Sequence, residues 1–267
     1  MLFICPLCQS ILILDKTRWV CDHGHSFDVA KQGYVNLLPV QYKKSKNPGD
    51  TPDAVLARRE FLQAEFYEPL RQVLIQKLAA LQPKVVLDLG CGEGYYTSGM
   101  SDIAAQVIGL DIAKPAVQIA AKRYPAMTWL VASGAKLPIK TGVLDVVCSF
   151  FSPLPMDEMT RVLRHDGYLI VATPAPQHLY EMRAALFDQV NLHQPEKFVD
   201  LLAPSFQVIE QQTVSYPLSL NTSALKNLLA MTPYAWKAKA DKRQQLEQHE
   251  LFVTQASFQV YVFQKMK

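Results

Sequence analysis

Four potential metal ligands lie within the first 25 residues, in the pattern Cys-x2-Cys-x12-Cys-x3-His. They are Cys5, Cys8, Cys21 and His25. Two short turns can bring three thiolates and one imidazole together around Zn²⁺ in a tetrahedral arrangement. Four protein ligands leave no open position for water, so the pattern predicts a structural zinc site rather than a catalytic one. Metal binding would then stabilise a segment that is too short to build its own hydrophobic core.

The identity of the fourth ligand and the state of the cysteines have alternatives. His23 also lies close to Cys21, but the three-residue spacing to His25 forms the better turn for aiming both side chains at one ion. Disulfide bonds and unpaired structural thiols are the rival interpretations of the cysteines. Residues 1–13 lack the basic start and the cleavage site of a secretory signal, so we expect reduced thiols that bind zinc.

A second candidate site is the glycine-rich segment 85–94, in which an apolar run reaches Asp88 and three glycines follow. The glycines are Gly90, Gly92 and Gly94. Without Cβ atoms, they let the backbone turn sharply and approach a ligand. Dinucleotide-binding loops use Gly-x-Gly-x-x-Gly, but here the third glycine comes one residue early and Tyr95 takes its place. The carboxylate of Asp88 would repel a diphosphate and suits a ligand with an amino group.

The elements that must position these residues alternate between strand-like and helix-like patterns. Strands are expected at 85–89, 107–110, 127–131, 143–149 and 168–173. Helical patterns cover 52–83, the segment from the glycine turn to about 103, 115–123 and 155–163. This alternation predicts an α/β fold with a largely parallel sheet and helices on both faces. Beyond it we expect helices near 179–187 and 224–231, and strands at 206–214 and 258–264.

The composition is that of a soluble globular chain, with 267 residues of which 49% are hydrophobic and no run long enough to span a membrane. Residues 1–59 contain 8 Lys/Arg and 5 Asp/Glu, whereas the remaining residues contain 19 of each, so the net charge of +3 lies at the N-terminal end. Two clusters mix basic and aromatic residues and are either solvated surface or RNA contacts. They are Tyr42, Lys43, Lys44 and Lys46, and Trp236, Lys237, Lys239, Lys242 and Arg243.

The order strand-Asp-x-Gly-x-Gly-x-Gly resembles the first motif of class I methyltransferases, which bind S-adenosylmethionine. The resemblance implies a Rossmann-like fold, with Asp88 near the methionine end of the cofactor, Asp111 at the ribose hydroxyls and Ser133 near the adenine. Tyr67, in the helical stretch that leads into the sheet, either covers the cofactor or is a core aromatic. His178 is a base, a cofactor contact or a solvated residue at a helix start. The expected cofactor-binding residues are Tyr67, Asp88, Gly90, Gly92, Glu93, Gly94, Tyr95, Tyr96, Asp111, Ser133 and His178.

Further segments together are similar to the bacterial 23S ribosomal RNA (guanine-N1)-methyltransferase family, which contains zinc. They are Cys5-Pro6-Leu7-Cys8, His25-Ser26-Phe27-Asp28, Gly33 to Pro39, Asn47-Pro48-Gly49-Asp50, Arg58-Arg59 with Phe61-Leu62, Cys91 to Tyr96, Thr173-Pro174 with His178-Leu179, and Met231-Thr232-Pro233 with Trp236. The resemblance implies a cytoplasmic enzyme that methylates a guanine in a hairpin loop of 23S rRNA. It also implies a homodimer whose zinc modules line an RNA cleft. We favour the housekeeping branch of the family over the branch that confers macrolide resistance.

We expect a zinc-binding RNA-recognition module at 1–37, a basic linker at 38–52 and a methyltransferase domain at 53–267. Guanine N1 carries a proton at neutral pH, so the site must remove it or stabilise the resulting anion. His178 is the candidate base, with a cofactor contact as its other interpretation. Phe150 and Phe151 either stack a flipped guanine or belong to the core. The alternatives are a tRNA or small-molecule methyltransferase of the same fold, and a non-catalytic RNA-binding zinc protein.

Overall fold

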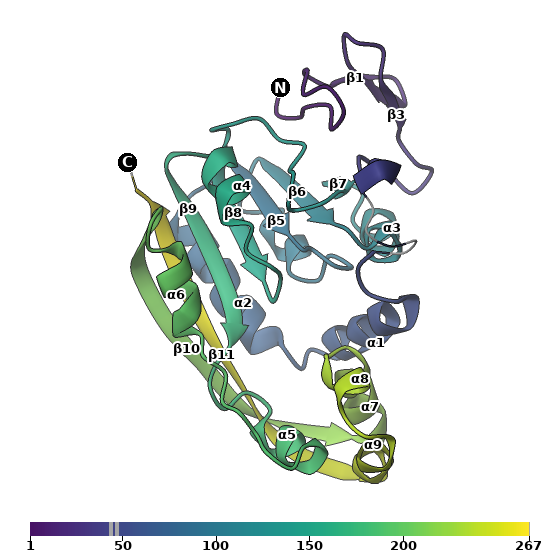
Figure 1. Cartoon of the computed structure of the whole chain (residues 1–267), viewed down its shortest axis with the longest axis vertical. Coiled ribbons are helices and arrows are strands. Elements are labelled where there is room, and N and C mark those ends of the chain that lie inside the picture. Colours follow the sequence, from purple (N-terminus) through teal and green to yellow (C-terminus); the bar gives the residue numbers. More distant parts are fainter. Residues whose placement is uncertain (43–44, 46–47, 267) are drawn as a thin grey trace.

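A mixed eight-stranded sheet runs through the centre of the protein (Figure 1), whose computed structural model describes residues 1–42, 45 and 48–266. The strand order is β10-β11-β9-β8-β5-β6-β7-β4, and every neighbouring pair from β9 to β4 is parallel. The parallel strands are β4 (Tyr34–Asn36), β5 (Val85–Leu89), β6 (Gln106–Asp111), β7 (Thr128–Val131), β8 (Leu144–Phe150) and β9 (Leu163–Pro174). The predicted α/β class with a largely parallel sheet is confirmed.

Helices cover both faces of the sheet, because strands buried on both sides need an apolar partner on each. On one face, α2 (Glu68–Ala80) buries Leu70, Leu74 and Leu78. α3 (Lys114–Arg123) packs against β6 and β7. On the other face, α4 (Met156–Val162) and α6 (Glu196–Leu202) complete the second core. The described part of the chain contains no helix with the length and hydropathy to cross a membrane.

The helical stretch 52–83 is divided into α1 (Pro52–Gln63) and α2. α1 begins where the Thr51 hydroxyl accepts a hydrogen bond from the N–H of Ala54 at 3.2 Å. The division falls just before Pro69, which fits the first turn of α2 but would interrupt a continuous helix.

The prediction of a helix between the glycine turn and residue 103 is wrong, because only a 3₁₀ helix (Thr97–Met100) forms there. Thr97 directs its hydroxyl to the carboxylate of Asp88, and the Ser98 hydroxyl bonds back to the carbonyl of Tyr95. Such local side-chain bonds compete with a regular helix.

A long antiparallel ribbon extends the sheet beyond β9 and is formed by β10 (Phe206–Asn221) and β11 (Leu251–Lys265). The expected strands 206–214 and 258–264 cover only about half of it. Pro217 lies within β10, which is an edge strand, where a missing N–H is tolerated. α5 (Tyr180–Leu186) lies against β11, and the chain between the two strands forms α7 (Thr222–Ala230), α8 (Tyr234–Lys237) and α9 (Ala240–Glu247), which gather beside α1 and α5 (Figure 1).

The N-terminal residues form a small antiparallel sheet of β1 (Ile13–Asp15), β2 (Arg18–Val20) and β3 (Ser26–Asp28). Two connections tie this part to the large sheet. β4 pairs with β7, and the backbone of residues 2–4 pairs with residues 138–140 through bonds of 3.0 Å (Ile4 N to Pro138 O) and 2.8 Å (Lys140 N to Leu2 O).

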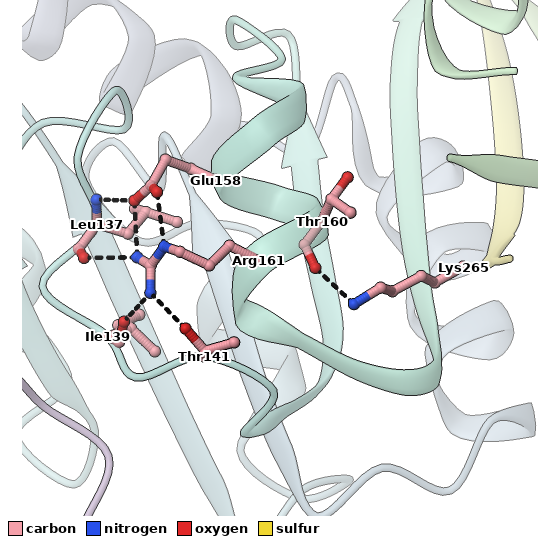
Figure 2. Close-up of polar contacts among 7 residues, drawn as sticks. All are labelled: Leu137, Ile139, Thr141, Glu158, Thr160, Arg161 and Lys265. Carbon is pink, nitrogen blue, oxygen red and sulfur yellow. Dashed lines mark hydrogen bonds and ion pairs between the residues drawn. The ribbon is translucent and has the colours of Figure 1, made fainter. Parts of the chain in front are cut away.

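The segment that receives residues 2–4 is itself braced by α4, as Figure 2 shows. The guanidinium of Arg161 donates to the carbonyls of Ile139 at 2.7 Å and Leu137 at 3.0 Å, and it pairs with Glu158 at 2.6 Å. Glu158 in turn accepts the N–H of Leu137. The N-terminal part therefore rests on a segment whose backbone is fixed by a charged pair.

Candidate metal centre and active site

The four predicted metal ligands come together, with their ligand atoms all within 4.8 Å of one another. Nδ1 of His25 lies 3.5 Å from Sγ of Cys5 and 3.4 Å from Sγ of Cys21, and Sγ of Cys8 lies 3.6 Å from Sγ of Cys21. With zinc bond lengths of about 2.3 Å to sulfur and about 2.0 Å to nitrogen, a tetrahedron has edges of roughly 3.5 to 3.8 Å. The donor set and its spacing therefore fit one Zn²⁺ ion.

The same geometry decides between the alternatives for the thiols and for the fourth ligand. The sulfur separation of 3.6 Å is far longer than a disulfide bond of about 2.0 Å, and all cysteines are free. His23 points elsewhere, with its Nδ1 2.9 Å from the hydroxyl of Ser10. A hydrogen bond from the backbone N–H of Ser10 lowers the pKa of Cys8 to about 6, which favours the thiolate that binds metal.

Asp88 lies at the C-terminal end of β5 and is only 2% exposed. The hydroxyl of Thr97 donates to it at 2.5 Å. Burial raises its pKa to about 7, and the nearby Asp111 and Glu93 act in the same direction. No ion pair to this carboxylate occurs within the described residues, so no cation of the protein holds its charge.

The first glycine of the loop is held against a second loop. Gly90 has a φ of +82°, and a Cβ placed on it would lie 2.5 Å from Cβ of Ser152. The Ser152 hydroxyl donates to the carbonyl of Leu89 at 2.7 Å and lies 2.7 Å from the hydroxyl of Ser149. The loop after β8 is therefore fastened to the end of β5, a contact that sequence spacing did not indicate.

Asp111 ends β6, next to the glycine loop. Its carboxylate accepts the N–H of Gly92 at 2.9 Å and the N–H of Ala113 at 2.8 Å. Burial raises the pKa of Asp111 and that of Glu93, which is 6% exposed. Ser133 follows the neighbouring strand β7 at the same edge of the sheet, and its hydroxyl accepts the N–H of Ala135 at 3.2 Å.

Arg58 on α1 supplies positive charge to this acidic edge. Its guanidinium contacts Asp50 at 2.5 Å and acts to lower the pKa values of Glu93 and Asp111. It also donates to the carbonyl of Met231 at 3.4 Å. Sequence analysis named Arg58 only within a segment that resembles the family. Its role at this edge could not be predicted, because Glu93, Asp111 and Met231 are distant from it in the chain.

An aromatic cluster lies near the glycine loop and consists of Tyr67, Tyr96, Phe151, His178 and Phe258. The ring of Phe258 is at its centre, 4.8 Å from Tyr67, 4.7 Å from His178 and 5.5 Å from Phe151. Phe151 also lies 6.4 Å from Tyr96, is 44% exposed and has a φ of +58°, an unfavourable backbone conformation for this residue. Phe150 is a core residue at 7% exposure, so the two phenylalanines differ.

His178 is buried and neutral. Its Nδ1 accepts the N–H of Ser257 at 3.2 Å, which leaves the ring proton on Nε2. Burial lowers its pKa to about 3, and the charges near it, His193 and Arg183, act in the same direction. Tyr67, 4% exposed, packs beside it and belongs to the core as well as to the aromatic cluster.

These features fit a cofactor that carries an ammonium group, a ribose and an aromatic base. Asp88 is a buried carboxylate without an ion pair among the described residues, and Asp111 stands at the next strand end. The hydroxyl of Tyr96 is buried without a hydrogen-bond partner in the described structure, which leaves it available to a bound molecule. The sheet edge therefore has the polar groups that S-adenosylmethionine requires.

Residues 3–46 match the zinc-ribbon family described as RlmA, N-terminal, and residues 87–171 match a methyltransferase domain. The 23S rRNA (guanine(748)-N(1))-methyltransferase of Streptomyces fradiae is 34% identical over 89% of this chain and 87% of its own length.

Among solved structures, the YcgJ protein of Bacillus subtilis superposes with a TM-score of 0.54 at 15% identity, over 74% of this chain and 98% of that one. The [4+2]-cyclase SpnF gives 0.50 at 17%, over 72% of this chain and 79% of that one. At these identities the likeness shows the class I fold alone.

The two domain matches and the Cys/His cluster make the protein an S-adenosylmethionine-dependent methyltransferase with a zinc site. The relative from Streptomyces fradiae aligns along nearly the whole chain, through both the zinc ribbon and the methyltransferase domain. This chain belongs to the 23S rRNA (guanine-N1)-methyltransferase family.

Proposed function

We propose that the protein transfers a methyl group from S-adenosylmethionine to N1 of a guanine in a hairpin loop of 23S rRNA. The observation that carries this proposal is the alignment of 89% of the chain with a 23S rRNA (guanine-N1)-methyltransferase. A glycine loop beside an aromatic cluster supports it, because a flipped base needs a stacking surface next to the methyl donor.

The cofactor-binding residues are the eleven expected from the sequence. When bound, S-adenosylmethionine supplies an electrophilic methyl group on a sulfonium. Asp88 binds the ammonium group, Asp111 accepts the ribose hydroxyls and Ser133 lies beside the adenine. The glycine loop with Glu93, Tyr95 and Tyr96 follows the methionine chain, and Tyr67 covers it. Cys5, Cys8, Cys21 and His25 hold the zinc, with a role in folding only.

Phe151 stacks the target guanine, since it is the exposed member of the aromatic cluster and its loop is fastened to the cofactor loop. His178 donates its Nε2 proton to an anionic acceptor in the site and does not act as a base, because its Nδ1 is already occupied. When the negative charge that develops on guanine O6 is stabilised, water can accept the N1 proton and no side chain has to act as the base. Alignment of guanine N1 with the methyl group supplies most of the remaining acceleration.

Cofactor affinity is expected to depend on pH through Asp88. Its pKa is raised to about 7 by burial, and the ammonium group binds the ionised form, so Asp88 must lose a proton on binding below that pH. The affinity should fall by roughly 16-fold between pH 7 and pH 5.5, and the fall should approach tenfold per unit below about pH 6. Calorimetric titration at several pH values measures this, and D88N should bind weakly with a flat profile. An equally steep profile in D88N contradicts the assignment.

We further propose the domain division 1–37, 38–52 and 53–267, with β4 extending the zinc module into the large sheet. The module and the linker behind it read RNA together, because the charge excess of the chain lies in residues 1–59 and all of it falls after residue 37. Lys43, Lys44 and Lys46 of the basic linker lie outside the described residues. We also propose that the protein is a homodimer and that it acts in the cytoplasm.

The test is transfer of label from S-adenosylmethionine to rRNA from a strain that lacks the gene. A methyl group on N1 blocks base pairing, so primer extension should stop at one guanine of a 23S rRNA hairpin loop. Transfer RNA from the same strain is the control and should remain unlabelled. Label in tRNA alone, or in no RNA, overturns the proposed substrate.

A further inference from the structure

The indole of Trp236 is 69% exposed on the short helix α8. Of the other two tryptophans, Trp129 is 1% exposed, and Trp19 is partly buried with its ring 4.4 Å from that of Phe3. An exposed indole offers a flat surface on which an unpaired base can stack.

Basic residues follow this ring closely in the sequence. Lys237 and Lys239 are exposed, and Lys242 follows on the first turn of α9. The contact of Lys239 with Asp188 is 3.8 Å long between two largely exposed side chains, so water screens it and Lys239 keeps its attraction for other anions. Arg243 fixes the geometry of the surface, because its guanidinium donates to the carbonyl of Ala235 at 2.6 Å.

α8 is also connected to the aromatic cluster and to the acidic residues at the cofactor loop. The hydroxyl of Tyr234 lies 3.4 Å from Nε2 of His193, whose ring is 6.3 Å from that of His178 in the aromatic cluster. Met231, just before α8, accepts a hydrogen bond from Arg58, whose charge acts to lower the pKa of Glu93 at the cofactor loop. A chain of contacts thus leads from the target-base site to the exposed indole.

We propose that α8 and the start of α9 form a docking platform for single-stranded RNA next to the target guanine. Trp236 stacks on an unpaired base, and Lys237, Lys239 and Lys242 contact the phosphates on either side of it. Stacking on aromatic rings flanked by cations is the general way in which proteins hold single strands. This inference rests on the proposed function, since the platform serves the loop that presents the guanine.

The test uses the full chain with two probes, a single-stranded 12-nucleotide RNA and the 23S rRNA hairpin. W236A should weaken binding of both by about 5- to 150-fold, whereas W236F should keep most of the affinity. Wild-type tryptophan emission should be quenched when RNA is added, and W236F should lose that quenching. Replacing Lys237 and Lys239 with Gln should reduce the slope of log affinity against log salt by about 1.4.

K84Q is the matched control, because Lys84 is exposed before β5 at the opposite edge of the sheet, and it should bind RNA as the wild type does. Cofactor affinity should be unchanged in every variant. RNA affinity of W236A within twofold of the wild type, or wild-type emission that RNA does not quench, overturns the platform. A protein that binds the single strand through Trp236 but methylates no rRNA overturns the proposed function instead.

Discussion

C8S is expected to abolish rRNA methylation while leaving cofactor affinity within a few fold of the wild type, and C5S should behave in the same way. Cys8 and Cys21 are neighbours in the cluster, so losing one thiolate removes a quarter of the ligand set and opens the site to water. The cofactor loop lies on β5 and β6, in the middle of the large sheet, and contains none of the metal ligands. Methyl transfer to rRNA and calorimetric titration of the cofactor measure the two effects.

The matched control is H23A, because His23 contacts Ser10 and not the cluster. This variant should retain one zinc per chain by metal analysis and should methylate rRNA normally, whereas H25A should lose the metal. If C8S lost cofactor affinity as fully as it lost RNA methylation, the module would be a support for the catalytic fold and not a reader of RNA.

G90A is expected to lower cofactor affinity by about 100-fold or more and to destabilise the fold. The left-handed backbone at Gly90 costs any other residue roughly 1 kcal/mol. The added methyl group would also lie 2.5 Å from Cβ of Ser152, so the two loops must separate and the bond from Ser152 to Leu89 is lost. Calorimetric titration measures the binding, and thermal unfolding measures the stability.

The variant G142A tests the effect of backbone strain in the absence of a steric clash. Gly142 also has a positive φ, of +69°, but a Cβ there meets nothing within 4 Å, and the position is remote from the glycine loop. It should lose about 1 kcal/mol of stability with no change in cofactor affinity. If G90A lost no more stability or affinity than G142A, the contact between the two loops would be unimportant.

Features encoded by short spacings could be predicted from the sequence. The zinc cluster depends on two turns within 25 residues, and the strand ends at Asp88 and Asp111 follow from apolar runs that end in an acidic residue. The alternation of strands and helices was enough to predict the class of fold, because each unit is local in the chain.

The aromatic cluster could not be assembled from the sequence, because it depends on pairings between distant segments. Phe258 meets Phe151 only because β11 pairs with β9, which sits beside β8. Arg58 finds Glu93 through the packing of α1 near the cofactor loop. The full length of β10 could not be predicted either. A strand that contains Pro217 is tolerated at the edge of a sheet, and the local sequence does not show that β10 lies there.

The two connections of the N-terminal part to the large sheet bear on the entropy of RNA binding. β4 pairs with β7, and residues 2–4 pair with a segment braced by Arg161 and Glu158. An RNA-binding domain on a flexible linker would lose translational and rotational freedom each time it and the catalytic site bound the same RNA. Here that freedom is already lost on folding, so under the proposed function RNA contacts at the zinc module and at the methyl donor would add within one preorganised surface.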